Sequence, residues 1–220
     1  MTAPMRFQPP WSGAFRLQTF VNRTPDALPV DATEAIRSAI LGSSLLGENN
    51  LTDQFSGTYG FSVTFRRESV SEVTARFPSF APFLEAALLP GCNAFLLNPL
   101  LIQNGRGVEA HLDRSMEFYA SGIGSPIAVS VLYVQVPQQL AGGELRLYHR
   151  GKQVAALAPR PRSLVTFRGD LTHEVVAVET GAAMLSEARI SLVVEQYRVP
   201  EALLAKVPAL ELRTRMGALE

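Results

Sequence analysis

The stretch Ile-Ala-Val-Ser-Val-Leu-Tyr-Val-Gln-Val, residues 127–136, decides the fold class of this chain. Both of its alternating faces are apolar apart from Ser130, Tyr133 and Gln135. A strand that is apolar on both faces is typically covered on both sides. We therefore expect a second sheet to pack on the inner face of this strand and helices from the N-terminal part of the chain to cover its outer face.

Similar short apolar runs surround this strand from Asn93 onward, with Gly, Pro and Asn between them. We predict eight strands, at residues 94–104, 108–113, 127–136, 144–148, 153–157, 163–168, 173–178 and 188–197. Short strands separated by turn residues favour a double-sheet jelly roll, the architecture that cupins share. The sequence therefore predicts a mainly β, cupin-like barrel.

Helical patterns precede this strand-rich region. Asp31 and Glu34 have the spacing of a capping box, and residues 32–46 after them are rich in helix formers, with apolar side chains at helical spacing. Two further helices are predicted to begin near Ser69 and Ser79. The last of these carries an aromatic stripe, which usually faces a core. We expect these helices to flank the barrel.

Two alternating runs and the C-terminal tail complete the prediction. Residues 14–21 and 59–66 alternate apolar with polar side chains, which is typical of strands with one solvated face. The tail from Pro200, with Leu203 and Val207, is predicted either as a helix that docks on the barrel or as a contact in a homodimer. The sequence leaves these alternatives open.

Length and charge bound the class of protein. A chain of 220 residues suits one catalytic domain, with a support region at 1–92, a jelly-roll core at 93–199 and a tail at 200–220. The 20 basic and 20 acidic residues balance and form no block of like charge. We therefore expect no nucleic-acid or anionic-membrane partner, and a small-molecule or peptide substrate instead.

Cysteine usage and hydropathy indicate a compartment. Cys92 is the only cysteine, which excludes an intrachain disulfide and favours a reducing environment. Residues 1–11 lack a basic region followed by an apolar run, and no run approaches eighteen consecutive apolar residues. We expect a cytoplasmic protein without a membrane span.

The stretch Glu-Ala-His-Leu-Asp at residues 109–113 carries the candidate metal ligands. In a strand, His111 and Asp113 project from one face because they are two residues apart. The pair alone is weak evidence, but His173 can add a second imidazole, and two His with one carboxylate form the facial triad of non-haem Fe(II) oxygenases. His149 lies in a turn between two strands, so we expect it to be solvated rather than a ligand.

An Arg-x-Ser further along the chain forms a candidate anion site. Arg189 and Ser191 share one strand face, the guanidinium fork matches a carboxylate, and the hydroxyl adds a donor. The apolar run that follows Arg189 predicts that this arginine is buried. A buried charge needs a partner, so we expect Arg189 to bind an anion.

The order of these motifs carries a family resemblance. An H-x-D, the Gly-Gly-Glu-Leu segment 142–145, a lone His before an apolar run and then Arg-x-Ser resemble the 2-oxoglutarate and Fe(II)-dependent dioxygenases. The likeness is strongest to the prolyl 4-hydroxylase-like branch and covers about Asn98 to Tyr197. It implies a jelly-roll barrel known as the double-stranded β-helix.

The resemblance also implies roles for the site residues. The three metal ligands would hold Fe(II), Arg189 and Ser191 would hold the distal carboxylate of 2-oxoglutarate, and Tyr133 would hydrogen-bond the same cosubstrate. With O2, such an enzyme releases succinate and CO2 and hydroxylates an unactivated C–H bond of a peptidyl residue or small metabolite. The presence of Asp113 favours hydroxylation over halogenation, because related halogenases replace that carboxylate with a small residue.

One departure from the family pattern concerns the cosubstrate site. Many relatives have a tyrosine nine residues before the H-x-D histidine, where this chain has Ile102, although Gly105 keeps the accompanying glycine. Gln103 and Asn104 are therefore candidates to replace the missing phenol.

The long stretch after the H-x-D motif is the candidate substrate loop. It carries Arg114, Met116, Phe118 and Tyr119, and loops at the mouth of a barrel usually determine specificity. Phe118 and Tyr119 fit a packing role equally well.

Two other functions compete with the oxygenase interpretation. A cupin-like metal-dependent isomerase or hydrolase would use the triad without 2-oxoglutarate, but it would leave the anion site at Arg189 without a ligand. A non-catalytic metal-binding barrel would not need the complete set of three ligands and the arginine.

Overall fold

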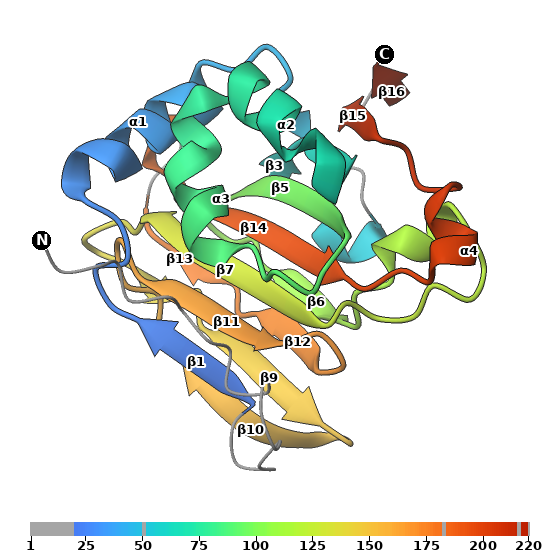
Figure 1. Ribbon diagram of the computed structural model, residues 1–220. Coiled ribbons are helices and arrows are strands. Elements are labelled where there is room, and N and C mark those ends of the chain that lie inside the picture. Colours follow the sequence, from blue (N-terminus) through green and yellow to red (C-terminus); the bar gives the residue numbers. More distant parts are fainter. Residues whose placement is uncertain (1–19, 50–51, 182–183, 215–216, 220) are drawn as a thin grey trace, which may run out of the picture.

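The computed structural model describes residues 20–49, 52–181, 184–214 and 217–219. Antiparallel sheets dominate it, and helices cover one face of the largest sheet (Figure 1). This arrangement confirms the predicted mainly β jelly roll with flanking N-terminal helices.

The largest sheet runs through the middle of the molecule. Among the described residues it has ten strands, in the order β1-β11-β7-β14-β5-β4-β15-β16, with β3 attached to β5 and β2 to β3. Their bounds are β1 Val21–Thr24, β2 Gly47–Glu48, β3 Tyr59–Gly60, β4 Ser62–Arg66, β5 Ala94–Ile102, β7 Ala128–Gln135, β11 Leu164–Arg168, β14 Arg189–Tyr197, β15 Leu210–Thr214 and β16 Gly217–Leu219.

Two smaller sheets complete the barrel. One has the order β10-β9-β12-β6, with β6 Val108–His111, β9 Leu145–His149, β10 Lys152–Leu157 and β12 Thr172–Val175, and the other pairs β8 Ala141–Gly142 with β13 Val178–Glu179. The α-helices are α1 Val30–Leu41, α2 Val70–Arg76, α3 Ala81–Ala87 and α4 Glu201–Leu204. The 3-10 helices are η1 Asp53–Phe55, η2 Arg67–Ser69, η3 Pro78–Phe80, η4 Ser115–Phe118 and η5 Leu185–Glu187.

Strand β7 has the two-sided packing that its sequence predicts. On its outer face Leu132 packs in one apolar cluster with Ile36 and Ile40 of α1. On its inner face Val131 packs with Leu147 of the four-stranded sheet. Full burial of a side chain of this size stabilises the fold by about 1.5–3 kcal/mol. The helices and the smaller sheet therefore hold β7 from opposite sides.

All eight predicted jelly-roll strands are present; most ends differ by one or two residues, as where the strand predicted at 94–104 ends at Ile102, and two differences concern the site. The strand predicted at 108–113 ends at His111, so Asp113 lies just beyond β6. The strand predicted at 173–178 is divided between β12, which ends at Val175, and β13, which begins at Val178 and pairs with β8 in a separate sheet.

The strand predicted at 59–66 is interrupted at Phe61. The flanking pairs Gly60 with Leu100 and Val63 with Leu97 keep one register, so Phe61 lies opposite Pro99. Proline has no amide hydrogen and cannot continue the ladder.

The first helix differs from its prediction at both ends. It begins at Val30 with Pro29 as the N-cap residue, so Asp31 lies inside its first turn and makes no side-chain cap bond. It ends at Leu41 rather than Leu46, because the Gly-Ser-Ser segment that follows has a poor helix propensity. The helix predicted near Ser69 is α2, and the helix predicted near Ser79 consists of η3 followed by α3. The stripe with Phe80 and Phe83 is buried as predicted.

The predicted C-terminal helix is mostly wrong. Helix α4 has four residues, and the chain then forms β15, which pairs with β4. Pro208 follows the helix closely and prevents its continuation, while Leu212 is buried opposite Val63. The tail therefore extends the large sheet.

Most of the strand predicted at 14–21 lies outside the described residues, and β1 begins at Val21. No helix among the described residues is long and apolar enough to cross a membrane.

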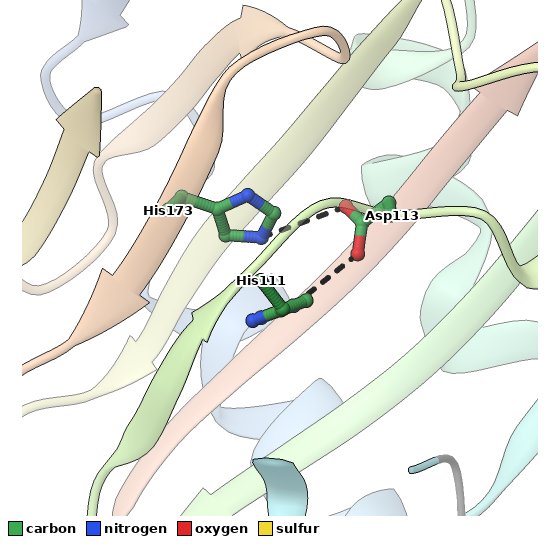
Figure 2. A group of neighbouring side chains, drawn as sticks. All are labelled: His111, Asp113 and His173. Carbon is green, nitrogen blue, oxygen red and sulfur yellow. Dashed lines mark ion pairs between the residues drawn. The ribbon is translucent and has the colours of Figure 1, made fainter. Parts of the chain in front are cut away.

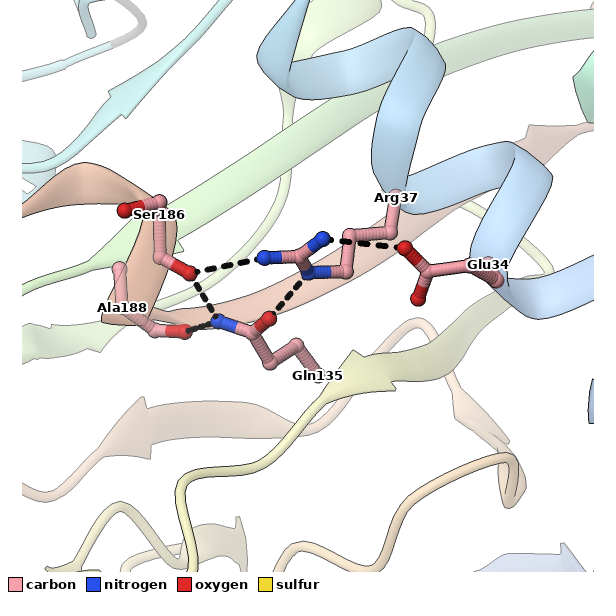
Figure 3. A network of polar contacts seen from close by, with 5 residues as sticks. All are labelled: Glu34, Arg37, Gln135, Ser186 and Ala188. Carbon is pink, nitrogen blue, oxygen red and sulfur yellow. Dashed lines mark hydrogen bonds and ion pairs between the residues drawn. The ribbon is translucent and has the colours of Figure 1, made fainter.

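A polar network anchors helix α1 to the barrel (Figure 3). Arg37 donates to Gln135 at the end of β7 and, at 3.2 Å, to the carbonyl of Ser186. Gln135 Nε2 donates to the carbonyls of Ser186 and Ala188 at 2.9 and 2.7 Å. The network therefore fixes the segment that leads directly into Arg189.

Candidate metal centre

Two paired strands bring the three candidate ligands together. His111 on β6 and His173 on β12 are direct register partners in antiparallel strands. Asp113 follows β6 by two residues and projects toward both imidazoles (Figure 2). Three side chains that are up to 62 residues apart in the sequence (173 − 111) therefore converge on one point.

The distances between these ligand atoms fit a single cation. Nε2 of His111 lies 3.3 Å from Oδ1 of Asp113, and Nε2 of His173 lies 3.5 Å from Oδ2. One ligand atom from each of the three residues lies within 4.8 Å of the other two. Bonds of about 2.1 Å to a cation place neighbouring ligand atoms about 3 Å apart when they meet it at right angles. A small contraction around the ion is therefore sufficient.

Backbone carbonyls fix the tautomer of both imidazoles. Nδ1 of His111 lies 2.7 Å from the carbonyl oxygen of Glu109, and Nδ1 of His173 lies 3.1 Å from that of Leu171. A carbonyl oxygen only accepts, so each Nδ1 carries the hydrogen and donates it. In the neutral ring this leaves the lone pair of Nε2 free for a metal.

Mutual charge effects hold the site close to the protonation state that a metal requires. Burial raises the pKa of Asp113, but the charge of His173 and the hydrogen bond with His111 outweigh it, so the pKa lies below its usual value. Burial lowers the pKa of His173. For His111, burial also lowers the pKa, but the bond and charge of Asp113 outweigh it and raise the pKa. Asp113 is therefore ionised and His173 neutral near neutral pH.

The centre also has a ligand atom that the protein leaves available for a metal. Apart from the 3.3 Å contact with Asp113 that shifts both pKa values, the buried Nε2 of His111 has no hydrogen-bond partner among the described residues. The rings of Phe55 and Phe167 pack edge-on against His111 and His173, with centroids 5.0 and 4.9 Å away. Two imidazoles and one carboxylate in this apolar frame fit Fe(II), with positions left open for reactants.

A narrow inner cavity of about 50 Å³ leads from the triad into the barrel. Its lining includes Arg189, Ser191 and Tyr133, which the sequence predicts for the cosubstrate. Arg189 is 1% exposed, and its guanidinium lies 5.0 Å from the centre of the Tyr133 ring. The structure thus brings all three residues to the cavity that also contains the metal ligands.

Polar atoms in this inner cavity lack partners. Arg189 Nη1 donates to Ser191 Oγ at 3.4 Å, but Arg189 Nε and the hydroxyl of Tyr133 have no hydrogen-bond partner among the described residues. Burial lowers the pKa of Arg189, and the phenol of Tyr133 offsets part of this effect. An unpaired buried guanidinium is costly, so an anion in this cavity would be strongly bound.

The expected replacements for the family tyrosine lie elsewhere. Neither Gln103 nor Asn104 lines the inner cavity. Asn104 Oδ1 instead accepts from the backbone N–H of Thr180 at 3.0 Å. Ile102 is buried in a separate apolar cluster opposite Arg189, and Gly105 has a φ of +74°, which explains the glycine at this turn.

A wider outer pocket of about 290 Å³ also borders the metal ligands. It shares His111, Asp113, Leu96, Phe55 and Glu195 with the inner cavity. Its other lining residues come from four segments: Thr52; Ser62 and Thr64; Leu112, Arg114, Ser115, Phe118 and Tyr119; and Arg213. The outer pocket therefore reaches the metal centre from the surface.

The predicted substrate loop is divided between pocket and core. Arg114, Phe118 and Tyr119 line the outer pocket, and Phe118 is 69% exposed. Met116 is fully buried in a separate apolar cluster, so it is a packing residue. Tyr119 serves both purposes, because its hydroxyl also donates to Glu211 Oε1 at 2.6 Å.

Sequence reasoning missed two polar and two aromatic residues that line the inner cavity. Asn98 is the one polar residue in β5, and Glu195 is a charged residue directly after an apolar run in β14, so this signal could have found them. Glu195 also lies an even number of residues from Arg189 and Ser191, so the three side chains share one face of the strand. Phe55 on η1 and Phe167 on β11 carry no such signal, because any buried aromatic residue has the same pattern.

Glu195 is a buried carboxylate beside the metal ligands. It is 5% exposed and accepts hydrogen bonds from the hydroxyls of Ser115, at 2.8 Å, and Tyr197. Burial and the charge of Asp113 raise its pKa well above the usual value, although these two hydrogen bonds lower it. His149, in contrast, is remote from the site and packs against Phe20, with ring centroids 5.0 Å apart.

Comparison with solved structures finds the same fold in bacterial enzymes. A prolyl-4-hydroxylase from Pseudomonas putida has a TM-score of 0.52 and 20% identity, over 81% of this chain and 93% of that one. A 2OG-Fe(II) oxygenase family oxidoreductase from Burkholderia pseudomallei has a TM-score of 0.54 and 15% identity, over 82% and 86% of the two chains. At this identity the likeness establishes the fold alone.

Comparison of sequences finds a matching family. None of the curated proteins compared with this chain matches it. Residues 97–194 match the family described as the 2OG-Fe(II) oxygenase superfamily, and the matched segment contains all three candidate ligands and Arg189. Residues 97–194 are therefore similar to the 2OG-Fe(II) oxygenase superfamily, whose members use Fe(II) and 2-oxoglutarate, and the converging triad in this segment agrees with that similarity.

Proposed function

We propose that this protein is a 2-oxoglutarate-dependent hydroxylase, which inserts one oxygen atom of O2 into an unactivated C–H bond of its substrate. The other oxygen atom enters succinate, which is released with CO2. The substrate is a small molecule or the side chain of a peptide, because the outer pocket of about 290 Å³ holds one group of that size.

One observation carries this proposal. The metal ligands and the buried Arg189 line the same inner cavity, with the triad at one part of the wall and the guanidinium at another. A dicarboxylate that binds a metal at one end needs a cation for its other end. The cavity offers both, which supports 2-oxoglutarate as its ligand.

The metal ligands of this chain would set the geometry of the reaction. His111, Asp113 and His173 would hold the ion and leave coordination positions for reactants. Fe(II), when bound there, supplies the activation of O2 and the oxidative decarboxylation of 2-oxoglutarate. The carbonyls behind each Nδ1 keep the imidazoles oriented during turnover.

Arg189, Ser191 and Tyr133 would hold the distal carboxylate of 2-oxoglutarate. The guanidinium supplies two parallel donors, and each hydroxyl adds one more. Binding would satisfy the Nε of Arg189 and the hydroxyl of Tyr133, which otherwise have no partner. These residues therefore position the cosubstrate and take no proton from it.

The apolar wall around the centre would exclude water. Phe55 and Phe167 pack against the two histidines, and Val131, Leu145 and Val193 line the inner cavity. Exclusion of water strengthens the electrostatic contacts and protects reactive species from side reactions.

An isomerase or hydrolase of the cupin type has less support. Neither reaction needs a second anion site, and Arg189 would then remain a buried and unpaired cation. The prolyl-4-hydroxylase activity of the Pseudomonas putida neighbour is not assigned to this chain, because 20% identity supports only a common fold.

Succinate formation tests the proposal. Anaerobically purified protein, supplied with Fe(II), 2-oxoglutarate and O2, should release succinate slowly even without substrate, and Arg189→Ala should abolish this at low 2-oxoglutarate. Omission of Fe(II) or O2 is the control. The hydroxylase proposal would be abandoned if the intact protein neither bound 2-oxoglutarate in the presence of metal nor formed succinate.

A further inference from the structure

We propose that the outer pocket selects a substrate with an aliphatic cationic group, an ammonium or a guanidinium, and that this group pairs with the carboxylate of Glu195. The inference rests on the proposed hydroxylase function and adds a substrate class to it. The C–H bond to be hydroxylated would then lie on the aliphatic chain next to the cationic nitrogen.

Glu195 lies beside the metal ligands, at the border of both cavities. It lies on the face of β14 that also carries Arg189 and Ser191, six residues beyond the arginine. It lines the inner cavity and the outer pocket, together with His111 and Asp113. A group bound to Glu195 from the outer pocket is therefore adjacent to the metal centre.

The hydrogen-bond partners of Glu195 are neutral. Its two oxygens accept one hydrogen bond each, from the neutral hydroxyls of Ser115 and Tyr197. A carboxylate has about four acceptor positions, so each oxygen can accept a further bond. No cationic side chain of the described residues pairs with this 95% buried carboxylate. A buried carboxylate without a countercharge is unusual and costly.

The charges of the enzyme loaded with Fe(II) and 2-oxoglutarate also leave Glu195 without a countercharge. The two positive charges of Fe(II) and the one of Arg189 are balanced by Asp113 and the two carboxylates of 2-oxoglutarate. An ionised Glu195 then has no counterpart in the loaded enzyme, which agrees with the pKa that burial and Asp113 raise. A cationic substrate supplies the missing positive charge and favours the ionised carboxylate, whereas a neutral substrate does not.

The remaining walls suit an aliphatic chain that carries such a group. Phe55, Leu96, Phe118 and Tyr119 line the outer pocket and offer apolar and aromatic surface. Aromatic faces also attract cations, as the guanidinium of Arg213 illustrates at 3.8 Å from the centre of the Phe118 ring. A pocket of about 290 Å³ fits a chain of the length of a lysine or arginine side chain.

A purely structural role for Glu195 is the alternative. Through Ser115 it connects η4 to β14, and it could serve only to hold that segment in place. Ser115→Ala removes this connection and keeps the carboxylate, whereas Glu195→Gln keeps the size and one acceptor and removes the charge. Only the charge matters for the recognition of a cation, so the two variants separate these roles.

The test uses matched probes that differ in one charge. The intact protein is loaded with Mn(II) and 2-oxoglutarate, and binding of l-lysine against l-norleucine and of l-arginine against l-citrulline is measured by calorimetry. A second arm uses N-acetyl-Gly-Lys-Gly-amide and its norleucine counterpart, which distinguishes a peptide side chain from a free amino acid. We expect at least one cationic probe to bind about thirtyfold or more tightly than its neutral match.

The variants then assign the preference to Glu195. In Glu195→Gln the ratio of the two affinities should fall to near one, with Glu195→Asp as a second variant that keeps the charge. Ser115→Ala should keep a clear preference, and so should Glu179→Gln, which removes an exposed charge outside both cavities. If the preference appears in just one of the two arms, that arm identifies whether the cation belongs to a free amino acid or to a peptide side chain.

Two results overturn the inference. One is equal binding of cationic and neutral probes in both arms, and the other is a preference that survives in Glu195→Gln. Either result leaves the hydroxylase proposal intact as long as the loaded protein binds 2-oxoglutarate and forms succinate. Absence of those two properties would instead end the proposed function itself.

Discussion

The inner cavity and the outer pocket of this protein are built in different ways. Most polar residues of the inner cavity project from regular strands, with Arg189 and Ser191 on β14, Tyr133 on β7 and His173 on β12, while Asp113 follows the end of β6. The outer pocket is assembled largely from connecting segments and the C-terminal strand β15. The chemistry of the family therefore lies on the rigid sheet, and the features that distinguish this chain lie on its connections.

The two sites also differ in how their polar groups are satisfied. In the inner cavity Tyr133, Arg189 and His111 each have a buried polar atom without a partner among the described residues. On the Tyr119 side of the outer pocket the polar groups satisfy one another, since Tyr119 and Arg213 both contact Glu211. The inner site is therefore completed by its ligands, whereas this side of the outer wall is complete without them and Glu195, at the metal end, lacks a countercharge among the described residues.

The largest effect should follow removal of a metal ligand. Asp113→Ala leaves two imidazoles and no charge to balance the ion, so Mn(II) or Fe(II) affinity should fall by more than about 100-fold and succinate formation should cease. Metal titration of the purified protein measures this. Asp31→Ala, which removes an exposed carboxylate on α1, is the matched control and should bind metal normally. Retained metal affinity in Asp113→Ala would contradict the assigned ligand set.

A smaller effect should follow changes at the anion site. Arg189→Ala should weaken 2-oxoglutarate binding by roughly thirtyfold or more, because the variant lacks the buried partner of the distal carboxylate. Arg189→Lys keeps the charge but loses the two-pronged geometry, so its affinity should lie between the two. Calorimetry with Mn(II)-loaded protein provides the values. Metal affinity should stay the same in both variants, and equal 2-oxoglutarate affinity in all three proteins would remove Arg189 from the site.

The inner cavity was largely predictable because it depends on strand periodicity. His111 and Asp113 are two residues apart, as are Arg189 and Ser191, and a spacing of two places side chains on one face of an extended chain. What the sequence did not contain was the register, which makes His111 the direct partner of His173. The family resemblance supplied this connection, because pairing between distant strands leaves no mark in local periodicity.

The outer pocket was not predictable from the sequence, because it depends on connecting segments rather than on strand periodicity. Arg213 reaches it on a strand that the spacing of Leu203 and Val207 had suggested to be helical, and η1 delivers Phe55 without any local motif. The substrate loop was predicted as a unit, yet Met116 packs in a core cluster while Phe118 remains exposed. Apolar residues in a connection do not reveal which of them the fold will bury.

The pH dependence of metal binding tests the electrostatics of the inner site. A metal can bind only the neutral imidazoles, and the pKa of His111 is raised by Asp113 while that of His173 is lowered by burial. Metal affinity should therefore be constant above the raised pKa of His111 and fall as the pH drops through it. The loss should approach tenfold per pH unit, since one proton must be displaced.

Mn(II) titrations between about pH 5.5 and 8.5 measure this slope. The pKa of Asp113 is lowered, so this carboxylate stays ionised and should add no proton over the range. A metal affinity that is unchanged from the top of this range to the bottom would show that His111 is not protonated in the metal-free protein, against the expected sign.

The smallest effect should come from the wall of the outer pocket. The hydroxyl of Tyr119 donates to Glu211 at 2.6 Å and lies 3.0 Å from the hydroxyl of Thr64, so it connects η4 to β15 and β4. Tyr119→Phe should lower the free energy of unfolding by about 1 kcal/mol, which corresponds to about 2–4 °C in Tm for a chain of this length. Thermal unfolding followed by circular dichroism measures the shift, and 2-oxoglutarate affinity should change less than twofold.

Tyr148→Phe provides the matched control for Tyr119→Phe. Tyr148 also donates to a carboxylate, at 2.5 Å from Glu174, but it lies on β9 and lines neither cavity. Because water competes for this more exposed hydrogen bond, its loss should shift Tm less than the loss of the Tyr119 bond. Equal shifts would mean that the wall of the outer pocket is no more ordered than the solvated surface. A changed 2-oxoglutarate affinity in Tyr119→Phe would mean that the two sites are coupled, although they are built from separate parts of the fold.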